Sequence, residues 1–371
     1  MQSIINSILK EERNKRETEE QEPEKFINPL SPSLENEIES YLVRSIPKIR
    51  VIGVGGAGNN AINRLNQVGI IGAETFAVNT DAQDLVYTDA DAKLLIGKKL
   101  TGGLGAGNRP QVGEAAALES IEEIKKMVNA DMVFITCGEG GGTGTGASHI
   151  IAEQARDLGA LTISICSLPF NVEGPKKKQN AAWGLERLSK SSDTIITVPN
   201  EKLLEIAPDL SISEAFRIVD EILIQGVKGI AEVITKPGLI NLDFADVKTI
   251  LKNSGESLIG LGEADTVEEA TRMALSNPLL DLDIHEARGA LINICGTGNS
   301  LKLQETENVI RMVTDELNRE TEIIWGTLID PNMEKKFRIT LIVSGIKSNS
   351  DDSFEPNTSQ PKFPDFGLRR L

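Results

Sequence analysis

Two glycine-rich segments are the parts of this chain best suited to bind an anion. Gly53–Gly58 follows an apolar run and opens a helical pattern, and Gly140–Gly146, which reads Gly-Gly-Gly-Thr-Gly-Thr-Gly, follows the apolar run ending at Cys137. Glycine permits tight turns and close approach of backbone amides, and a helix N-terminus presents unpaired amides to phosphate. Two such loops at one sheet edge predict a phosphate site larger than a dinucleotide fold requires.

A third glycine cluster, Gly102–Gly107, follows the strand-like segment Lys93–Ile96. It could fold over a terminal phosphate, but by itself it fits a plain loop equally well. The Gly53–Gly58 segment alone also matches a dinucleotide fingerprint, with Asp81 as the ribose-binding acid. An NAD(P)-dependent oxidoreductase is therefore an alternative, although it leaves the Gly140–Gly146 loop unexplained.

Acidic residues gather at a second place, where a loop passes into a helical pattern. Asn241, Asp243 and Asp246 lie there, and carboxylates three residues apart face the same side of a first helical turn. Helix capping and compensation of the helix dipole are the simplest roles for such a pair in isolation. A catalytic role needs further support.

The pattern around these segments predicts an α/β protein. From Lys48, apolar runs of strand length alternate with amphipathic stretches, which is typical of a Rossmann-like parallel sheet flanked by helices. The expected strands are 48–54, 74–79, 131–137, 161–166 and 193–198. The expected helices are 57–67, 111–128, 144–158 and 175–190.

A long helix is expected at 211–234, opened by a capping box of Ser211 and Glu214 and closed by Pro237-Gly238. After about residue 255 the pattern runs strand, helix, strand, helix, and then two strands at 321–329 and 336–344, which indicates a smaller α+β domain. The predicted organisation is a partly disordered N-terminal extension with a short helix (1–47), a nucleotide-binding domain (48–210), the central helix (211–234), the α+β domain with the acidic loop (235–347) and a disordered tail (348–371).

Composition excludes several classes of protein. A formal net charge of −16 is unsuited to neutralising nucleic-acid phosphates. Two histidines are too few for a histidine-rich zinc site or a Ser/His/Asp triad, and Cys137, Cys166 and Cys295 lie in apolar runs as expected for reduced core residues. No apolar stretch has the length of a membrane span, so we expect a cytoplasmic protein without direct membrane insertion.

The order of several motifs makes a family resemblance specific. These motifs are the first glycine loop, Asn79-Thr80-Asp81, Gly103–Gly107, the Gly140–Gly146 loop, Pro169–Gly174, Pro199-Asn200 and Gly238–Val247. In this order they resemble the FtsZ family of the tubulin superfamily over roughly residues 48–345. Lys177 stands where bacterial members usually have arginine, and with the N-terminal extension this favours a divergent, archaeal branch, while a bacterial host stays open.

The resemblance implies roles for individual residues. Glu173 should hold the ribose of GTP, Phe216 should stack on guanine and Asp220 should bond to it, with Lys177 supplying charge. Asn241, Asp243 and Asp246 should be catalytic, reaching the nucleotide of the neighbouring subunit. The residues implied in phosphate binding are Gly55, Gly56, Ala57, Gly58, Asn59, Gly141, Gly142, Thr143, Gly144 and Thr145, with Ala106 and Gly107 near the terminal phosphate.

The implied function is that of a polymerising cell-division GTPase, which hydrolyses GTP to GDP and phosphate between subunits of a homopolymer, with Mg²⁺ not held by protein side chains. The implied location is the cytoplasm at the division site. The terminal peptide Phe363–Leu371 resembles a tail that docks on membrane-anchoring or adaptor proteins. A non-hydrolysing structural relative of the same fold is a further alternative, against which the intact Asp243 and Asp246 count.

Overall fold

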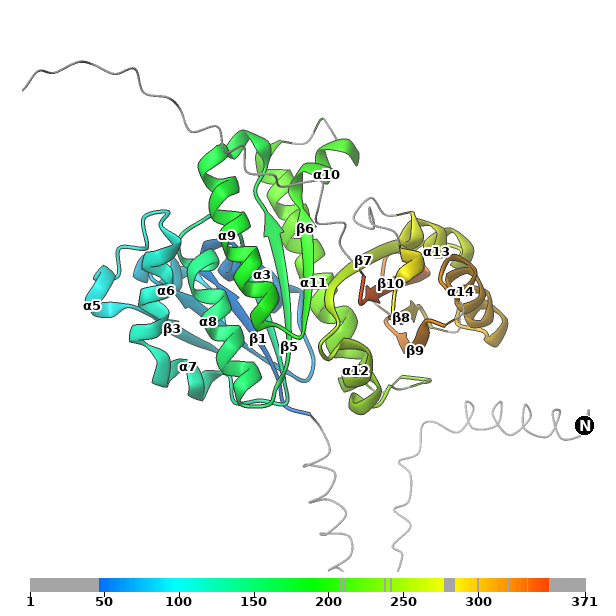
Figure 1. Ribbon diagram of the computed structural model, residues 1–371. Coiled ribbons are helices and arrows are strands. Elements are labelled where there is room, and N and C mark those ends of the chain that lie inside the picture. Colours follow the sequence, from blue (N-terminus) through cyan, green and yellow to red (C-terminus); the bar gives the residue numbers. More distant parts are fainter. Residues whose placement is uncertain are drawn as a thin grey trace, which may run out of the picture. The chain divides into compact units, whose positions relative to one another are not determined.

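The structure is a computed structural model that describes residues 47–206, 209, 211–236, 238–240, 242–276, 284–298, 300–318, 320–331 and 333–346 (Figure 1). Several sequence-based expectations lie outside these residues. They concern the extension up to residue 46 with its short helix, the tail from 348 with its terminal peptide, Pro237 and Asn241.

The first half of the described chain alternates strands and helices. Its elements are β1 (Ile49–Val54), α3 (Gly55–Val68), β2 (Ala73–Asn79), α4 (Ala82–Tyr87), β3 (Ala92–Leu95), α5 (Lys98–Thr101), α6 (Pro110–Glu119), α7 (Ile121–Met127), β4 (Met132–Gly138), α8 (Thr143–Asp157), β5 (Leu161–Leu168), the 3₁₀ helix η1 (Asn171–Glu173), α9 (Pro175–Ser191), β6 (Thr194–Pro199) and α10 (Asn200–Ile206). The expected strands and helices of this half are confirmed, with one exception.

The exception is the helix expected over 111–128, which is wrong as a single element. It is two helices, α6 and α7, which meet at Ser120, where φ is −107° and ψ is 27°. The Ser120 hydroxyl accepts a hydrogen bond from the Gly97 amide at 3.1 Å. This bond ties the point where the two helices meet to the loop at Gly97.

The second half begins with the long helix α11 (Ile212–Thr235), whose capping box of Ser211 and Glu214 forms as predicted. It continues with α12 (Phe244–Leu251), β7 (Gly255–Ala264), α13 (Val267–Leu275), the 3₁₀ helix η3 (Ile284–Glu286), β8 (Gly289–Gly296), α14 (Leu303–Glu316), β9 (Glu322–Ile329) and β10 (Phe337–Ser344). The predicted succession of strands and helices after residue 255 is confirmed.

Within the described residues, ten strands form one sheet in the order β3-β2-β1-β4-β5-β6-β7-β10-β8-β9. Every pairing from β3 to β7 is parallel, and Thr194 to Ile196 of β6 pair with the start of β7. β10 runs antiparallel between β7 and β8, so β9 and β10 do not pair although they follow each other in sequence. The sheet is therefore parallel in its first part and mixed in its second.

Alternating side chains of the parallel strands pack on two helical layers, as strand geometry requires. Val51 and Phe134 belong to a core with residues of α3 and α11, whereas Ile52 and Ile135 belong to a core with residues of α6 and α8. Figure 1 shows α8 and α9 on one face of these strands. The three cysteines are buried thiols, which confirms their prediction as reduced core residues.

Candidate active site

A cavity of about 510 Å³ lies where the parallel strands end, within the usual size range for ligand pockets. The carboxyl ends of β1, β4 and β5 open into it. Its lining includes most of the predicted phosphate and ribose residues: Gly55, Gly56, Ala57, Ala106, Gly141, Gly142, Thr143, Gly144, Glu173, Lys177 and Phe216. The structure thus brings together three glycine-rich loops that are far apart in sequence.

Two long helices, α3 and α8, begin in this cavity without a side-chain cap. Val54 and Gly142 occupy their N-cap positions, and neither provides a side-chain hydrogen bond to the first turn. Uncapped N-terminal amides need another acceptor, and the aligned peptide dipoles favour an anion there. Two such ends in one cavity form a cradle for a chain of phosphates.

Glycine is required where the loops touch each other. Gly55 has φ of 72°, and a Cβ built on it would lie 2.7 Å from the Gly144 amide nitrogen. A Cβ on Gly142 would lie 2.8 Å from the Cβ of Ala106. Side chains at these positions would separate the loops, so the glycines keep the three loops in contact around one cavity.

The third glycine loop is fixed to the loop after β2 and, through α9, to the second glycine loop, so it is more than a plain connection. The Gly105 amide donates to Thr80 O at 3.1 Å and the Ala82 amide to Gly103 O at 3.0 Å. Asn180 of α9 donates to Gly140 O at 3.1 Å and to Asn108 O at 3.2 Å, which joins the second and third loops. Sequence reasoning missed Asn180, because it lies mid-helix without a local motif.

Glu173 and Lys177 lie together at the cavity, with Lys177 Nζ 2.6 Å from Glu173 Oε2. Glu173 also accepts a hydrogen bond from the Phe170 amide. Lys177 supplies the one ammonium group among the described lining residues, while Asp81, Asp84, Glu139 and Glu173 supply carboxyl groups. Phosphates in this cavity must therefore be bound chiefly by backbone amides.

Phe216 and Asp220 lie one turn apart on α11, but they line different hollows. Phe216 lines the cradle cavity and packs edge-on against Phe170 at 5.5 Å between ring centroids. Asp220 lines an adjoining hollow of about 620 Å³ together with Asn60. Burial raises the pKa of Asp220 to about 6. Asn60 was missed at sequence level, where only Asn59 of the Asn59-Asn60 pair was selected.

Four predicted phosphate-site residues, Gly58, Asn59, Gly107 and Thr145, do not line the cavity. Asn59 is buried and donates to Asp84 Oδ2 at 2.9 Å. The Thr145 hydroxyl accepts from the Gly140 amide at 2.8 Å and so shapes the loop from within.

Glu139 is a lining residue that the sequence gave no reason to select. It is buried, its Oε1 lies 3.8 Å from Cys137 Sγ, and among the described residues no hydrogen-bond partner reaches its Oε2. Burial raises the pKa of Glu139 to about 8. Burial thus favours the uncharged form of this carboxyl group, which lies beside a site for anions.

Asp243 and Asp246 lie apart from the cradle. Both are exposed at the start of α12, and Asp243 occupies its N-cap position without a side-chain hydrogen bond to the helix. The preceding loop is fixed to β9, since Ile240 N donates to Thr327 Oγ1 at 3.1 Å and Thr327 N donates to Ile240 O at 3.0 Å. The Asp243 side chain therefore does not cap α12, although the sequence allowed that role.

The described residues include no group of three or more His, Cys, Asp or Glu side chains that could hold a metal ion. At the cavity, Asp84 Oδ2 accepts from Asn59 and Asn79, and Asp81 caps α4. Magnesium usually keeps several waters and binds through one or two carboxylates together with substrate phosphates. The residues present fit an ion held mainly by a nucleotide.

The fold and the cradle together define a nucleotide-binding protein of the tubulin type. A sequence model of the tubulin/FtsZ family, GTPase domain, matches residues 48–208, and one of the FtsZ family, C-terminal domain, matches residues 255–347. The chain therefore belongs to the FtsZ family and is a GTPase.

Curated relatives agree with this membership. The chain is 50% identical over 347 residues to cell division protein FtsZ 1 of Pyrococcus abyssi, with 92% of each chain covered. It is 50% identical to cell division protein FtsZ 1 of Methanocaldococcus jannaschii, covering 92% of this chain and 91% of the relative.

Solved structures agree as well. An FtsZ dimer from M. jannaschii, described as empty, matches with a TM-score of 0.81 and 51% identity, covering 86% of this chain and 94% of that one. CetZ2 from Haloferax volcanii, solved as a GTPγS-bound protofilament, matches with a TM-score of 0.67 at 22% identity, covering 81% and 94%. The latter likeness concerns the fold alone.

Proposed function

We propose that this GTPase polymerises and hydrolyses GTP at the contact between successive subunits of a filament that acts in cell division. One subunit binds the nucleotide in its cradle. The next subunit supplies Asp243 and Asp246, with Asn241 in the same loop. The relatives named as cell division proteins support this role, and the placement of the two half-sites supports the sharing.

The observation that carries the proposal is that the two half-sites lie at opposite ends of the strands of the parallel sheet. The cradle is at the carboxyl end of β5, where Leu168 pairs with Pro199 at the end of β6. The C-terminal end of α12 is fixed at the opposite end of β6, where the Thr194 hydroxyl donates to Leu251 O. Figure 1 shows α12 far from α10, which follows the carboxyl end of β6.

Dimensions argue against an encounter of the two half-sites within one chain. β6 has six residues and spans about 20 Å. Asp246 precedes Leu251 by five helical residues, which is an axial distance of about 8 Å. Whichever way α12 points, these lengths leave a gap of about 12 Å between Asp246 and its own cradle, which supports a site shared between subunits. The exposed carboxylate of Asp246 is available to another molecule.

Guanine fits the region around Phe216 and Asp220. The exposed ring of Phe216 can stack on a base that extends from the cradle, and a carboxylate one helical turn further along can accept hydrogen bonds from guanine N1–H and N2–H₂. Adenine offers an acceptor and a lone pair in their place. We therefore propose Asp220 as the residue that selects GTP.

Hydrolysis is phosphoryl transfer to water, for which positioning and charge stabilisation are the main requirements. Backbone amides of the cradle bind the phosphate oxygens, and Lys177 adds a positive charge. A Mg²⁺ ion bound with the nucleotide would neutralise further phosphate charge. The neighbour's Asp243 and Asp246 orient and polarise the attacking water, after which GDP and phosphate remain and the subunit contact weakens.

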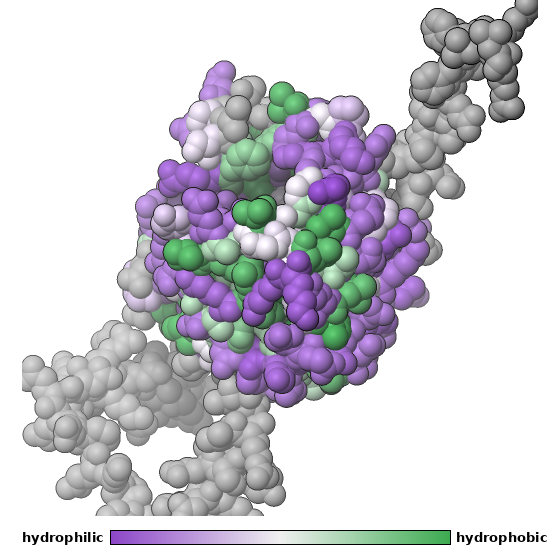
Figure 2. All heavy atoms as spheres, turned by 90° about the vertical axis from the view of Figure 1, so that its left-hand side faces the viewer, coloured by the Kyte–Doolittle hydropathy of each residue, from purple (hydrophilic) through white to green (hydrophobic). Residues whose placement is uncertain are grey.

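Exposed apolar side chains flank both half-sites, as expected for surfaces that dock. Leu104 and Val172, beside the cradle, are 88% and 85% exposed, and Leu239, beside the acidic loop, is 62% exposed. Figure 2 looks onto the side of the protein that carries α5 and shows separate apolar patches between polar side chains. A longitudinal contact between copies would cover such residues at each end of a subunit.

The proposed setting is the cytoplasm at the division site. Among the described residues, no helix has the length and apolar character needed to cross a membrane. The terminal peptide Phe363–Leu371, which combines two phenylalanines with two arginines, is proposed as the segment that binds a membrane-anchoring or adaptor protein.

Mixing two inactive variants tests the shared site. Asp246→Ala removes the donated carboxylate and leaves the cradle intact. Gly141→Leu places a side chain at the cavity, where no atom lies within 4 Å of a built Cβ, so the protein accommodates it while the nucleotide does not. Each variant alone should lack turnover. A mixture should regain it, because GTP on the first meets Asp246 of the second.

The control is a subunit that carries both changes, which should not restore turnover to the Asp246→Ala subunit. If the mixture stays inactive while both variants enter filaments, as measured by co-sedimentation, the shared site is wrong. If the wild type binds GTP and polymerises without releasing phosphate, the non-hydrolysing scaffold is the better account.

A further inference from the structure

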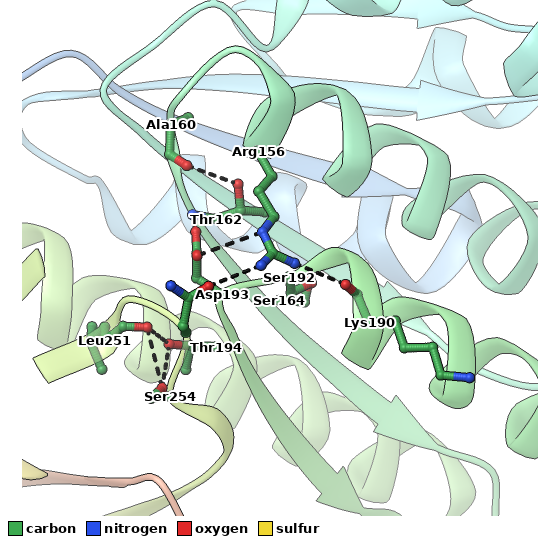
Figure 3. Close-up of polar contacts among 11 residues, drawn as sticks. Arg156, Ala160, Thr162, Ser164, Lys190, Ser192, Asp193, Thr194, Leu251 and Ser254 are labelled. Atoms are coloured by element: carbon green, nitrogen blue, oxygen red, sulfur yellow. Dashed lines mark hydrogen bonds and ion pairs between the residues drawn. The ribbon is translucent and has the colours of Figure 1, made fainter. Parts of the chain in front are cut away.

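Arg156, in the last turn of α8, joins three separate parts of the chain. Its Nη1 donates to Lys190 O at 2.9 Å, its Nη2 donates to Asn253 Oδ1 at 2.9 Å, and its Nε lies 3.9 Å from Asp193 Oδ1. Figure 3 shows the Arg156 guanidinium between Asp193 and the main chain at Lys190. The planar fork of arginine suits such simultaneous contacts, which lysine cannot reproduce.

Asp193 fixes the start of β6 to its neighbours. Its side chain is only 4% exposed, and its Oδ2 accepts from the Thr162 amide of β5 at 2.9 Å. The Asp193 amide donates to Thr162 O, and the Asp193 carbonyl oxygen accepts from the Gly255 amide at the start of β7. Removing this carboxylate would leave a buried amide without an acceptor, so Asp193 is unsuitable for a test of function.

Asn253 connects this cluster to α12. It follows the C-cap residue of α12 and has φ of 54°, a left-handed conformation that asparagine tolerates better than most residues. Beside it, the Ser254 hydroxyl lies 2.9 Å from the Thr194 hydroxyl and donates to Leu251 O at 3.2 Å. Figure 3 shows Thr194, Leu251 and Ser254 together next to Asp193. The C-terminal end of α12 is thus held by side chains at the start of β6.

The helices that meet at this cluster begin at the two half-sites. α8 begins with Thr143 in the cradle, and α9 begins at Pro175, two residues after Glu173. α12 begins at Phe244, between Asp243 and Asp246. The cluster therefore connects the far ends of the cradle helices to the far end of the helix that presents the acidic loop.

We infer that Arg156, Asp193 and Asn253, which we call the α8–α12 junction, act as positioning residues that hold α12 so that Asp246 meets the neighbouring subunit's nucleotide. This inference rests on the proposed shared site. The junction touches neither nucleotide nor water itself. Its role is to fix the orientation and axial position of α12, whose exposed end must be placed accurately. Small displacements of a catalytic group lower the rate strongly.

Substitutions at Asn253 give a matched test. Asn253→Gly keeps the left-handed backbone and removes the acceptor for Arg156, whereas Asn253→Asp keeps an acceptor and adds charge attraction. We expect Asn253→Gly to lower kcat about tenfold. GTP affinity should be unchanged, and Asn253→Asp should retain turnover. Arg156→Met should behave like Asn253→Gly, because it keeps the aliphatic stem and loses all three contacts.

Arg187→Met is the control for loss of an arginine side chain from the neighbouring helix α9. Arg187 stacks on Trp183, at 3.9 Å from the ring centroid, and its Nη1 donates a hydrogen bond to Trp183 O in its own helix. This variant should keep wild-type turnover. Thermal unfolding of all variants shows whether a change in kcat follows a change in stability. If the junction only stabilised the fold, kcat would fall in proportion to the fraction of unfolded protein. Titration of bound GTP measures the fraction that remains folded.

The mixing experiment shows in which subunit the junction acts, the one that donates Asp246 or the one that binds GTP. Arg156→Met added to the Gly141→Leu subunit, which donates Asp246, should lower the restored turnover about tenfold. The same change added to the Asp246→Ala subunit, which only binds GTP, should have little effect. If the basic mixture fails, the shared site is wrong. If it works and Arg156→Met is without effect in the donor, or equally harmful in both subunits, the inference about the junction is overturned.

Discussion

The cradle and the acidic loop, which we propose as the two halves of one catalytic site, are built by opposite means. The cradle is made of backbone, with glycines whose added Cβ atoms would collide, and its loops bond to one another. The acidic loop presents side chains, and Asp243 and Asp246 are exposed with no role in capping their own helix. A region completed by its own chain is packed. A region that another molecule is proposed to complete is left open.

This difference between the two regions predicts that substitutions in them alter different properties of the protein. Changes in the cradle alter how a subunit binds its own nucleotide, whereas changes in the acidic loop should alter only what happens on a neighbour. The two halves can therefore be separated by measuring binding and turnover on the same variant.

The largest effect is expected for Asp246→Ala. Turnover should fall on the order of 100-fold or more, because the attacking water loses its orienting carboxylate, while GTP affinity stays at the wild-type value. Phosphate release and equilibrium binding of a fluorescent GTP analogue measure the two quantities. Filaments should persist longer, because GDP does not form. Loss of binding in this variant would contradict the separation of the two halves.

A smaller effect on GTP affinity is expected when pH changes the ionisation of Asp220, at the site proposed for guanine. Burial raises the pKa of Asp220 to about 6, and only the ionised carboxylate can accept both guanine N–H groups. GTP affinity should therefore weaken as pH falls from 7 to 5. Asp220→Asn should bind GTP weakly with little pH dependence over this range. A wild-type affinity that does not change between pH 7 and 5 would show that Asp220 does not bind the base.

The smallest effect concerns Glu139, whose side chain occupies space left by Gly184 of α9. Burial raises the pKa of Glu139 from 4.5 to about 8, so the folded protein keeps a proton that the unfolded chain releases above about pH 4.5. The free energy of unfolding should fall as pH rises from 4.5 to 8 for this reason. Glu139→Gln removes that dependence and should be more stable than the wild type at pH 8, by a few degrees in Tm.

Glu153→Gln, at an exposed position of α8, is the control for this comparison and should follow the wild type. Equal stabilities of Glu139→Gln and the wild type at both pH 5 and pH 8 would show that Glu139 ionises without cost in the fold.

The sequence predicted the parallel sheet and the cradle well, for physical reasons. Strand-length apolar runs and uncapped glycine loops are local signals, and each loop sits at the end of its own strand. Residues that join loops were not predicted. Asn180 and Arg156 act from helices far away in sequence, and nothing in their neighbours indicates which main-chain oxygens they reach.

The break at Ser120 and the site of Asp220 show the same limit. The amphipathic pattern continues across Ser120, and no local signal shows that α6 and α7 separate there or that the Ser120 hydroxyl binds the distant Gly97 amide. Asp220 was assigned by resemblance to the base of the nucleotide, whereas its place in a hollow beside the cradle, together with Asn60, depends on how α11 packs against α3.

The central claim is that a single subunit has only half of the catalytic site. Turnover per subunit, measured over a range of protein concentrations alongside light scattering, tests it most directly. We predict negligible turnover at low concentration, a rise at the concentration where scattering appears, and scattering that forms with GTP and decays with GDP. Turnover per subunit that is constant across all concentrations, including those without scattering, would contradict the shared site.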